Sequence, residues 1–163
     1  MNATGCWISP SRWGGTRECG FDEAVMLCDK IYCEIINDRE GIHVRPEMIR
    51  LILKTVGIDY VVAITDACTG SVDDSDVNMV DGVLYGSKMR MIQAARNFRH
   101  NAGLNMMDVF KVCSRNPARA IHMDHLVGTV EPGKKADFVI IDEDYHILKV
   151  LLGGNTVVDN TRG

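Results

Sequence analysis

Several features are missing from this chain of 163 residues, and each absence excludes a class of protein. The longest apolar stretches, such as residues 58–64, are far too short to cross a bilayer. The start of the chain lacks the basic residues and apolar core of a secretory signal. Lysine and arginine are dispersed and the net charge is −4, which gives no electrostatic footprint for DNA or RNA. We therefore expect a cytoplasmic protein that binds neither membranes nor nucleic acid.

The cysteines lack the spacing of a thiolate zinc site. None of the 6 cysteines forms a CxxC pair, which argues against structural zinc. They are spread over a chain that is 46% hydrophobic, enough to build a core without disulfides, so we predict reduced thiols. Length and composition fit one soluble globular domain, or a piece of one.

A βαβ unit is predicted in the first half of the chain. Residues 31–36 are rich in β-forming side chains and predict a strand. Pro46 suits the first turn of a helix whose apolar residues repeat at 3.6-residue spacing until Gly57. A second strand is predicted over residues 60–65. This order favours a parallel sheet with functional loops at the carboxyl ends of its strands.

The remaining segments predict an α/β chain with a different C-terminal pattern. Residues 1–30 predict a loop with a short helix at 23–27, and residues 71–76 an acidic loop. Ser87 is expected to cap a helix that runs to Gly103, and Asn105 with Asp108 to begin another that ends before Pro117. Beyond Gly128 the pattern predicts short strands over residues 138–141, 147–152 and 157–158.

Asp66 is the strongest candidate for chemistry. It ends the apolar, β-branched run Tyr-Val-Val-Ala-Ile-Thr at residues 60–65. A carboxylate at a strand end can accept a proton from a bound water and return it to a leaving amine. The alternative is an aspartate that only caps a helix or orders its loop.

Two basic residues suit an anionic ligand. The imidazole of His43 can donate to a phosphate or a sugar hydroxyl, although a loop histidine is also common as a solvated side chain. The guanidinium of Arg17 can bind phosphate oxygens through two parallel hydrogen bonds, or it can pair with Glu18 at the surface.

Four stretches in a fixed order carry a resemblance to a known family. They are Gly-Ile-His-Val-Arg-Pro at residues 41–46, Thr-Asp-Ala at 65–67, Asn-Pro-Ala-Arg-Ala at 116–120, and the run from 128 to 142 that contains Pro-Gly-Lys-Lys-Ala-Asp. Together they resemble the C-terminal part of the N-acetylglucosamine-6-phosphate deacetylases, in the amidohydrolase superfamily. The last two stretches are interpreted as structural, a helix stop and a turn into the final strands.

The resemblance implies roles for individual residues. Asp66 would be the general base and acid, and His43 would contact the phosphorylated sugar. Arg17, in an Arg-Glu-Cys-Gly stretch that resembles the family's Arg-Glu-Pro-Gly, would reach the substrate of a neighbouring subunit, which implies a homodimer. The further substrate-binding residues implied are Asn2, Ala3, Leu84, Tyr85 and Gly86. Arg45 stands where the family often has histidine, and its role is left open.

The implied fold is incomplete. Residues 1–127 would form the C-terminal part of a (β/α)8 metal-dependent hydrolase barrel, and residues 128–163 the strands of an accessory β-sandwich. In the family the N-terminal strands of the sandwich come from a segment that is absent here. We therefore expect exposed strand edges and half-covered apolar faces, with marginal stability, self-association or a partner.

The resemblance also implies that the metal centre of the family is missing from this chain. The family holds a divalent metal, Zn or Fe, with a Glu and two His that would precede Asn2, so this chain is expected to lack the ligands. The first hypothesis is a deacetylase-like hydrolase of the acetamido group, present as a C-terminal fragment, that gives glucosamine 6-phosphate and acetate. The alternatives are an inactive truncated remnant, a fragment that only binds the sugar phosphate, and another amidohydrolase.

Overall fold

The computed structural model describes residues 7–8, 17–18, 20–68, 70 and 73–161. Two short strands, β1 (Trp7–Ile8) and β2 (Arg17–Glu18), pair antiparallel, where the sequence predicted an irregular segment. The short helix expected nearby is confirmed as α1 (Phe21–Leu27). Among the described residues, no helix has both the length and the apolar character needed to cross a membrane.

The predicted βαβ unit is confirmed. Strands β3 (Cys33–Ile36) and β4 (Val61–Ile64) pair in parallel, with Cys33 opposite Val61 and Ile36 opposite Ile64. Between them lie α2 (Pro46–Val56) and the short 3-10 turn η1 (Ile58–Tyr60). Gly57 ends α2 at a φ of 83°, and its N–H donates to the Leu53 carbonyl at 3.2 Å. Glycine is suited to this position because a positive φ costs it little.

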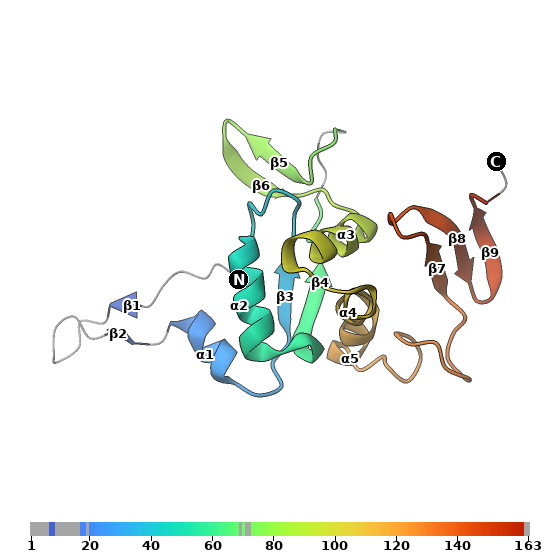
Figure 1. Cartoon of the computed structure of the whole chain (residues 1–163), viewed down its shortest axis with the longest axis horizontal. Helices are drawn as coiled ribbons and strands as arrows, with labels where there is room; N and C mark the ends of the chain where they lie inside the picture. The colour runs from blue at the N-terminus through green and yellow to red at the C-terminus, as the bar shows by residue number, and fades with distance from the viewer. Residues whose placement is uncertain (1–6, 9–16, 19, 69, 71–72, 162–163) are drawn as a thin grey trace.

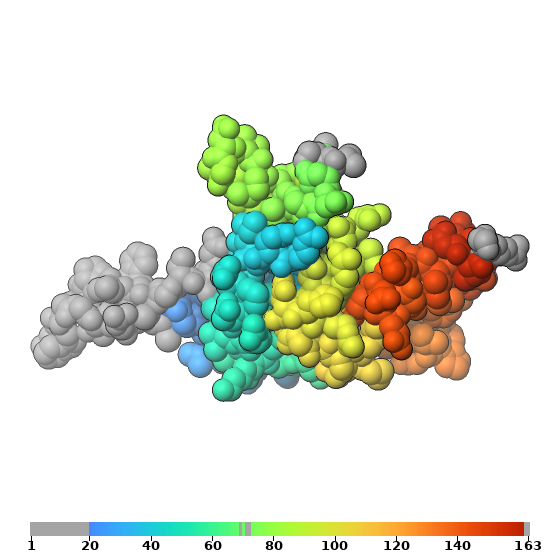
Figure 2. Space-filling view, turned by 45° about the horizontal axis from the view of Figure 1, so that its top comes forward, coloured from blue at the N-terminus to red at the C-terminus, as the bar shows by residue number. Residues whose placement is uncertain are grey.

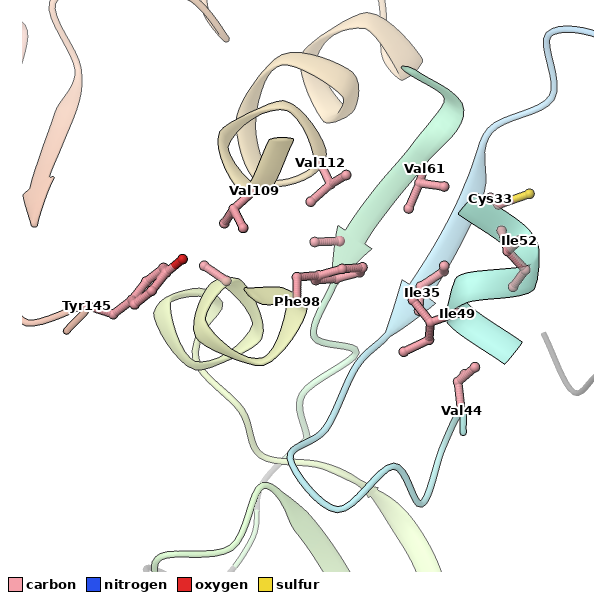
Figure 3. Close-up of a cluster of buried hydrophobic side chains, with 12 residues drawn as sticks. Cys33, Ile35, Val44, Ile49, Ile52, Val61, Phe98, Val109, Val112 and Tyr145 are labelled. Atoms are coloured by element: carbon pink, nitrogen blue, oxygen red, sulfur yellow. The ribbon is translucent and has the colours of Figure 1, made fainter. Parts of the chain in front are cut away.

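The core lies between this sheet and the helices that pack on it (Figure 3). Ile35 of β3, Val61 of β4, and Ile49 and Ile52 of α2 are fully or almost fully buried. Phe98 projects into the same cluster from the opposite side (Figure 3). Close packing of such side chains holds β3 and β4 in place, and with them the loops that follow each strand.

A β-hairpin follows the parallel pair and was not predicted. Strands β5 (Val77–Val80) and β6 (Val83–Ser87) are joined by Asp81 and Gly82, at φ 50° and 78°. Positive φ at both turn residues is the type I′ geometry that Asp-Gly favours between strands. The hairpin projects from the end of the molecule where β3 and β4 finish (Figures 1 and 2).

Ser87 does not cap the next helix, so that prediction was wrong. It lies inside β6, opposite Val77, and its buried hydroxyl accepts the Met89 N–H at 3.0 Å. Helix α3 (Met91–Ala102) begins later, after Arg90, whose backbone N–H donates to the Gln93 side chain at 2.8 Å. As predicted, it ends at Gly103.

The next helical stretch runs through the predicted stop. Asn105 caps α4 (Met106–Phe110) as expected, by accepting the Asp108 N–H at 2.9 Å. The chain then continues through the π-helical segment η2 (Lys111–Arg115) into α5 (Asn116–Ala120). Pro117 lies in the first turn of α5, directly after the π-helical segment. The predicted helix end before Pro117 was therefore wrong.

The three C-terminal strands are confirmed as one antiparallel sheet, β7-β8-β9. They are β7 (Phe138–Ile141), β8 (Ile147–Leu152) and β9 (Asn155–Asp159), the last longer than predicted. The sheet lies beside the helices at one side of the molecule (Figures 1 and 2). Val139, Leu152 and Val157 are exposed, which confirms the expected half-covered apolar faces.

Candidate functional site

The register of the parallel pair sets the geometry of the candidate site. Ile36 and Ile64 are opposite each other, and Asp38 and Asp66 each lie two residues further along. The loops after β3 and β4 therefore leave the same end of the sheet. This is the end at which parallel α/β proteins gather their functional residues.

Asp66 lies at this strand end with an exposed side chain. Its φ is 45°, a left-handed backbone conformation that is uncommon outside glycine but tolerated by aspartate and asparagine. The turn directs the chain out of the sheet immediately after β4. It thereby leaves the carboxyl group accessible to a ligand.

The loop after Asp66 is fastened to the hairpin. The Cys68 N–H donates to the Ser87 carbonyl at 2.8 Å, and Ala67 forms a parallel bridge with Ser87. Gly86, at φ 107°, lies so close to Cys68 that an added Cβ would stand 3.1 Å from its sulfur. The structure thus brings the Asp66 loop against the predicted substrate segment that contains Leu84, Tyr85 and Gly86.

Within that segment the side chains differ in their exposure to solvent. Tyr85 is 70% exposed, whereas Leu84 is half-buried. The exposed phenol ring offers both an apolar face and a hydroxyl at the hairpin.

His43 follows β3 and is held by a buried acid. Its side chain is only 11% exposed, and its Nδ1 lies 3.1 Å from Oδ2 of Asp38. The Asp38 carboxylate also accepts the backbone N–H groups of Ile42 and His43, each at 2.8 Å. These bonds fix the start of the loop that contains His43.

A buried polar network supports the same end of the sheet and was missed by the sequence analysis. Asp76 is almost fully buried and accepts the Asn97 side-chain amide at 2.7 Å and the Arg39 backbone N–H at 2.9 Å. The same amide donates to the Asn37 carbonyl at 2.9 Å. Asp76 thus joins α3, the β3 loop and the base of the hairpin. The sequence suggested only an acidic, solvated loop because its partners are distant along the chain.

The charged residues around this network are solvated. Glu40 accepts a hydrogen bond from Arg39 Nε at 2.8 Å, and this bond and the Glu40 charge raise the pKa of Arg39 above its ordinary value. Arg45 is exposed and lies 4.0 Å from Glu47. Such surface ion pairs contribute little to stability.

Three predicted residues are not tested by this geometry. Asn2 and Ala3 lie outside the described residues. Arg17 lies in β2, and its side chain is outside the described part of the chain.

The described part of the chain does not supply a metal centre by itself. No group of three or more His, Cys, Asp or Glu side chains within it is placed to hold a metal ion. Carboxylate and imidazole groups are present in Asp38, His43 and Asp66, but Asp38 is fully buried and its oxygens already face hydrogen-bond donors of its own loop. A divalent ion at this site would need ligands from elsewhere.

The fold and the sequence together define the class of protein. The amidohydrolase family matches residues 1–157, and this chain belongs to that family. Among solved structures, it is similar to N-acetylglucosamine-6-phosphate deacetylase from Pasteurella multocida, with a TM-score of 0.72 and 30% sequence identity over 83% of this chain and 39% of that one.

Curated relatives agree with this family. N-acetylgalactosamine-6-phosphate deacetylase of Shewanella sp. (strain ANA-3) is 29% identical over 155 residues, which are 85% of this chain and 38% of that relative. The chain thus spans about two-fifths of the length of such relatives. A shorter relative from Escherichia coli (strain K12) is 29% identical over 153 residues, and the chain covers 90% of it.

Proposed function

We propose that this chain forms the substrate-binding and proton-transfer part of a hydrolase that removes the acetyl group of an N-acetylhexosamine 6-phosphate. The observation that carries the proposal is the parallel register of β3 and β4, because it starts the His43 and Asp66 loops at one end of the sheet. Family membership supports the reaction class. In this proposal residues 1–127 belong to a (β/α)8 barrel and residues 128–163 to an accessory β-sandwich.

Asp66 is the proposed proton carrier. Water attacks the acetamide carbonyl carbon while the Asp66 carboxylate accepts a proton from that water. The protonated carboxyl then gives the proton to the amine nitrogen as the C–N bond breaks, which releases acetate and the hexosamine 6-phosphate. The accessible carboxyl and its strand-end position support this role.

The sugar phosphate is proposed to lie between the His43 loop and the hairpin. His43 would contact the phosphorylated sugar, while Leu84, Tyr85 and Gly86 would line the opposite side. Asn2, Ala3 and the Arg17 of a second subunit are proposed as further contacts in a complete homodimeric enzyme. The link between Cys68 and Ser87 supports this arrangement because it holds the hairpin against the Asp66 loop.

A divalent metal, Zn or Fe, is the proposed cofactor of the complete enzyme. The described residues contain no group suited to hold it, so its ligands would come from outside this part of the chain. We therefore expect the purified chain with added Zn²⁺ or Fe²⁺ to release no acetate from N-acetylglucosamine 6-phosphate. Measurable turnover by the chain alone would show that the assignment of the ligands is wrong.

Catalysis is tested by a chimaera in which this chain replaces the matching region of the Pasteurella multocida relative. Asp66→Asn keeps a residue that tolerates the left-handed backbone but removes the proton acceptor. We expect kcat to fall by about 10²–10⁴ with a small change in KM. Asp74→Asn, at an exposed residue of the acidic loop that follows Asp66, is the matched control and should leave kcat unchanged. Equal activity of the Asp66→Asn and control chimaeras would refute the role of Asp66.

A galactosamine substrate is the second candidate. It is favoured by the Shewanella relative, whose name specifies N-acetylgalactosamine 6-phosphate. The two sugar phosphates differ in the configuration of a single ring hydroxyl. Measuring kcat/KM of the chimaera for each one identifies the better substrate. Binding without turnover of either sugar would favour the inactive, sugar-phosphate-binding alternative, and turnover of an unrelated amide would favour another amidohydrolase.

A further inference from the structure

The side chain of Asp38 has no role in the substrate contacts or the proton transfer proposed above. Asp38 is fully buried at the carboxyl end of β3. Its Oδ1 accepts the Ile42 N–H at 2.8 Å, and its Oδ2 accepts the His43 N–H at 2.8 Å and lies 3.1 Å from His43 Nδ1. The loop is anchored from a second side, since the Asn101 side-chain amide donates to the Asp38 carbonyl at 3.0 Å. The imidazole is thus held through one of its two ring nitrogens.

We propose that Asp38 is a positioning residue that fixes the ring orientation and tautomer of His43. A carboxylate offers only acceptor atoms, so the hydrogen shared with the ring belongs to Nδ1. In the neutral imidazole, Nε2 is then the nitrogen without hydrogen, and it accepts a hydrogen bond from a ligand hydroxyl. When His43 is protonated, the same Nε2 donates to a phosphate oxygen. Asp38 thereby determines which nitrogen is presented to the substrate.

The structural alternative is that Asp38 only orders the loop through its two backbone bonds. The two roles are separable by measurement, because the ring tautomer reports the bond to Nδ1 and thermal stability reports the order of the loop. Asp38→Ser removes Oδ2, the atom that faces the imidazole, and leaves a single hydroxyl oxygen as an acceptor for the loop. Asn101→Ala is the matched control, since it removes the other anchor of the loop without touching His43.

The test is the nitrogen chemical shifts of the His43 ring in the ¹⁵N-labelled full chain. The expected result is the Nδ1–H tautomer in the wild type and in Asn101→Ala, and its loss in Asp38→Ser. Both variants are expected to melt at a lower temperature, so melting alone does not distinguish the two roles. An Nε2–H tautomer in the wild type, or an unchanged tautomer in Asp38→Ser, overturns the inference. If Asp38→Ser does not fold, an Nε2–H tautomer in the wild-type spectrum still overturns the inference.

The consequence for substrate rests on the proposed function and is measured separately, with N-acetylglucosamine 6-phosphate as the probe. Loss of one hydrogen bond between His43 and the ligand is expected to cost about tenfold in affinity, so Asp38→Ser should raise Kd by roughly that factor. A changed tautomer with an unchanged Kd refutes the sugar contact of His43 and leaves the positioning role intact. A raised Kd with an unchanged tautomer refutes the positioning role.

Discussion

The α/β region, residues 20–127, and the C-terminal sheet, β7 to β9, differ in how they bury their apolar residues. Three of the four residues of β4 are buried, whereas no residue of β7, β8 or β9 is. The sheet reaches the core of the α/β region mainly through Tyr145, with Ile141 packed nearby. An aromatic residue therefore links a region with its own core to one that lacks such a core (Figure 3).

This difference shows that two regions of one chain can depend to different degrees on a further layer of structure. A βαβ unit with covering helices buries side chains on both sides of its layers. A three-stranded sheet with apolar residues on exposed faces needs a second layer. We expect the α/β region to determine the stability of the chain and the C-terminal sheet to open first.

The largest effect is expected from the core of the α/β region. Phe98 is fully buried, so Phe98→Ala should lower the free energy of unfolding by roughly 3–5 kcal/mol. The matched change Val157→Ala, at an exposed position of β9, should cost less than about 1 kcal/mol. Urea unfolding measures both. Equal losses would show that the two regions share one core.

A smaller loss is expected from the polar network under the site. Asp76→Ala leaves the amides of Asn97 and Gln93 and the Arg39 N–H without their acceptor. The Asn97 donor is buried and the other two are partly buried, so the three lost bonds together should cost about 3 kcal/mol, again measured by urea unfolding. Asp144→Ala, in an exposed turn of the C-terminal sheet, is the control and should stay within about 0.5 kcal/mol. A loss no larger than that of the control would mean that the network does not support the site.

The junction between the regions is tested at Gly128. Its φ is 96°, and an added Cβ would lie 2.6 Å from the Cβ of Ala118 and 3.2 Å from the Ser114 carbonyl oxygen. Gly133 has a similar φ of 89° with open space around it, so it shares the backbone strain but not the clash. Gly128→Ala should be less stable than Gly133→Ala by about 2 kcal/mol. Equal melting temperatures would indicate a loose junction.

The two regions should respond to opposite ends of the pH range. Hydrogen bonds from the backbone and ring of His146 lower the pKa of Asp142, so its contribution is present above its ordinary pKa of 3.8 and is lost as the pH falls below that value. Burial raises the pKa of Cys113 from 9.0 to about 12, so its contribution is present below pH 9.0 and is lost as the pH rises toward 12.

Amide hydrogen exchange resolves these two responses by region. Acid should open the C-terminal sheet first, and Asp142→Asn should remove part of that sensitivity. Alkali should weaken the α/β region, and Cys113→Ala should remove part of that loss. Acid opening of α2 before the C-terminal sheet would contradict the comparison.

Local signals determined how much of the fold was predictable. Helix α2 was predicted from Pro46 to Gly57 because the start signal, the apolar repeat and the left-handed stop all lie within one stretch. The hairpin was missed although Asp81-Gly82 between two valines is a strong turn signal. The helix end predicted before Pro117 was wrong because the π-helical segment η2 continues the helical stretch into α5.

Some residues of the candidate site were likewise predictable from the sequence, and others were not. Asp66 and His43 were identifiable because each follows a predicted strand, and the parallel pairing confirmed the common end of the sheet. Asp38 and Asp76 were passed over because aspartates in polar loops are ordinarily solvated. Their burial depends on partners such as Asn97, which is 21 residues from Asp76 and 60 from Asn37.

The most direct test of the proposed site is a titration of the ¹⁵N-labelled chain with N-acetylglucosamine 6-phosphate, followed by amide chemical shifts. We predict saturable changes that converge on residues 41–45, 66–68 and 84–87, with none in β7 to β9. Changes confined to the C-terminal sheet, or to the cavity lined by Arg96, Arg99 and Tyr145, would contradict the site at the carboxyl ends of β3 and β4.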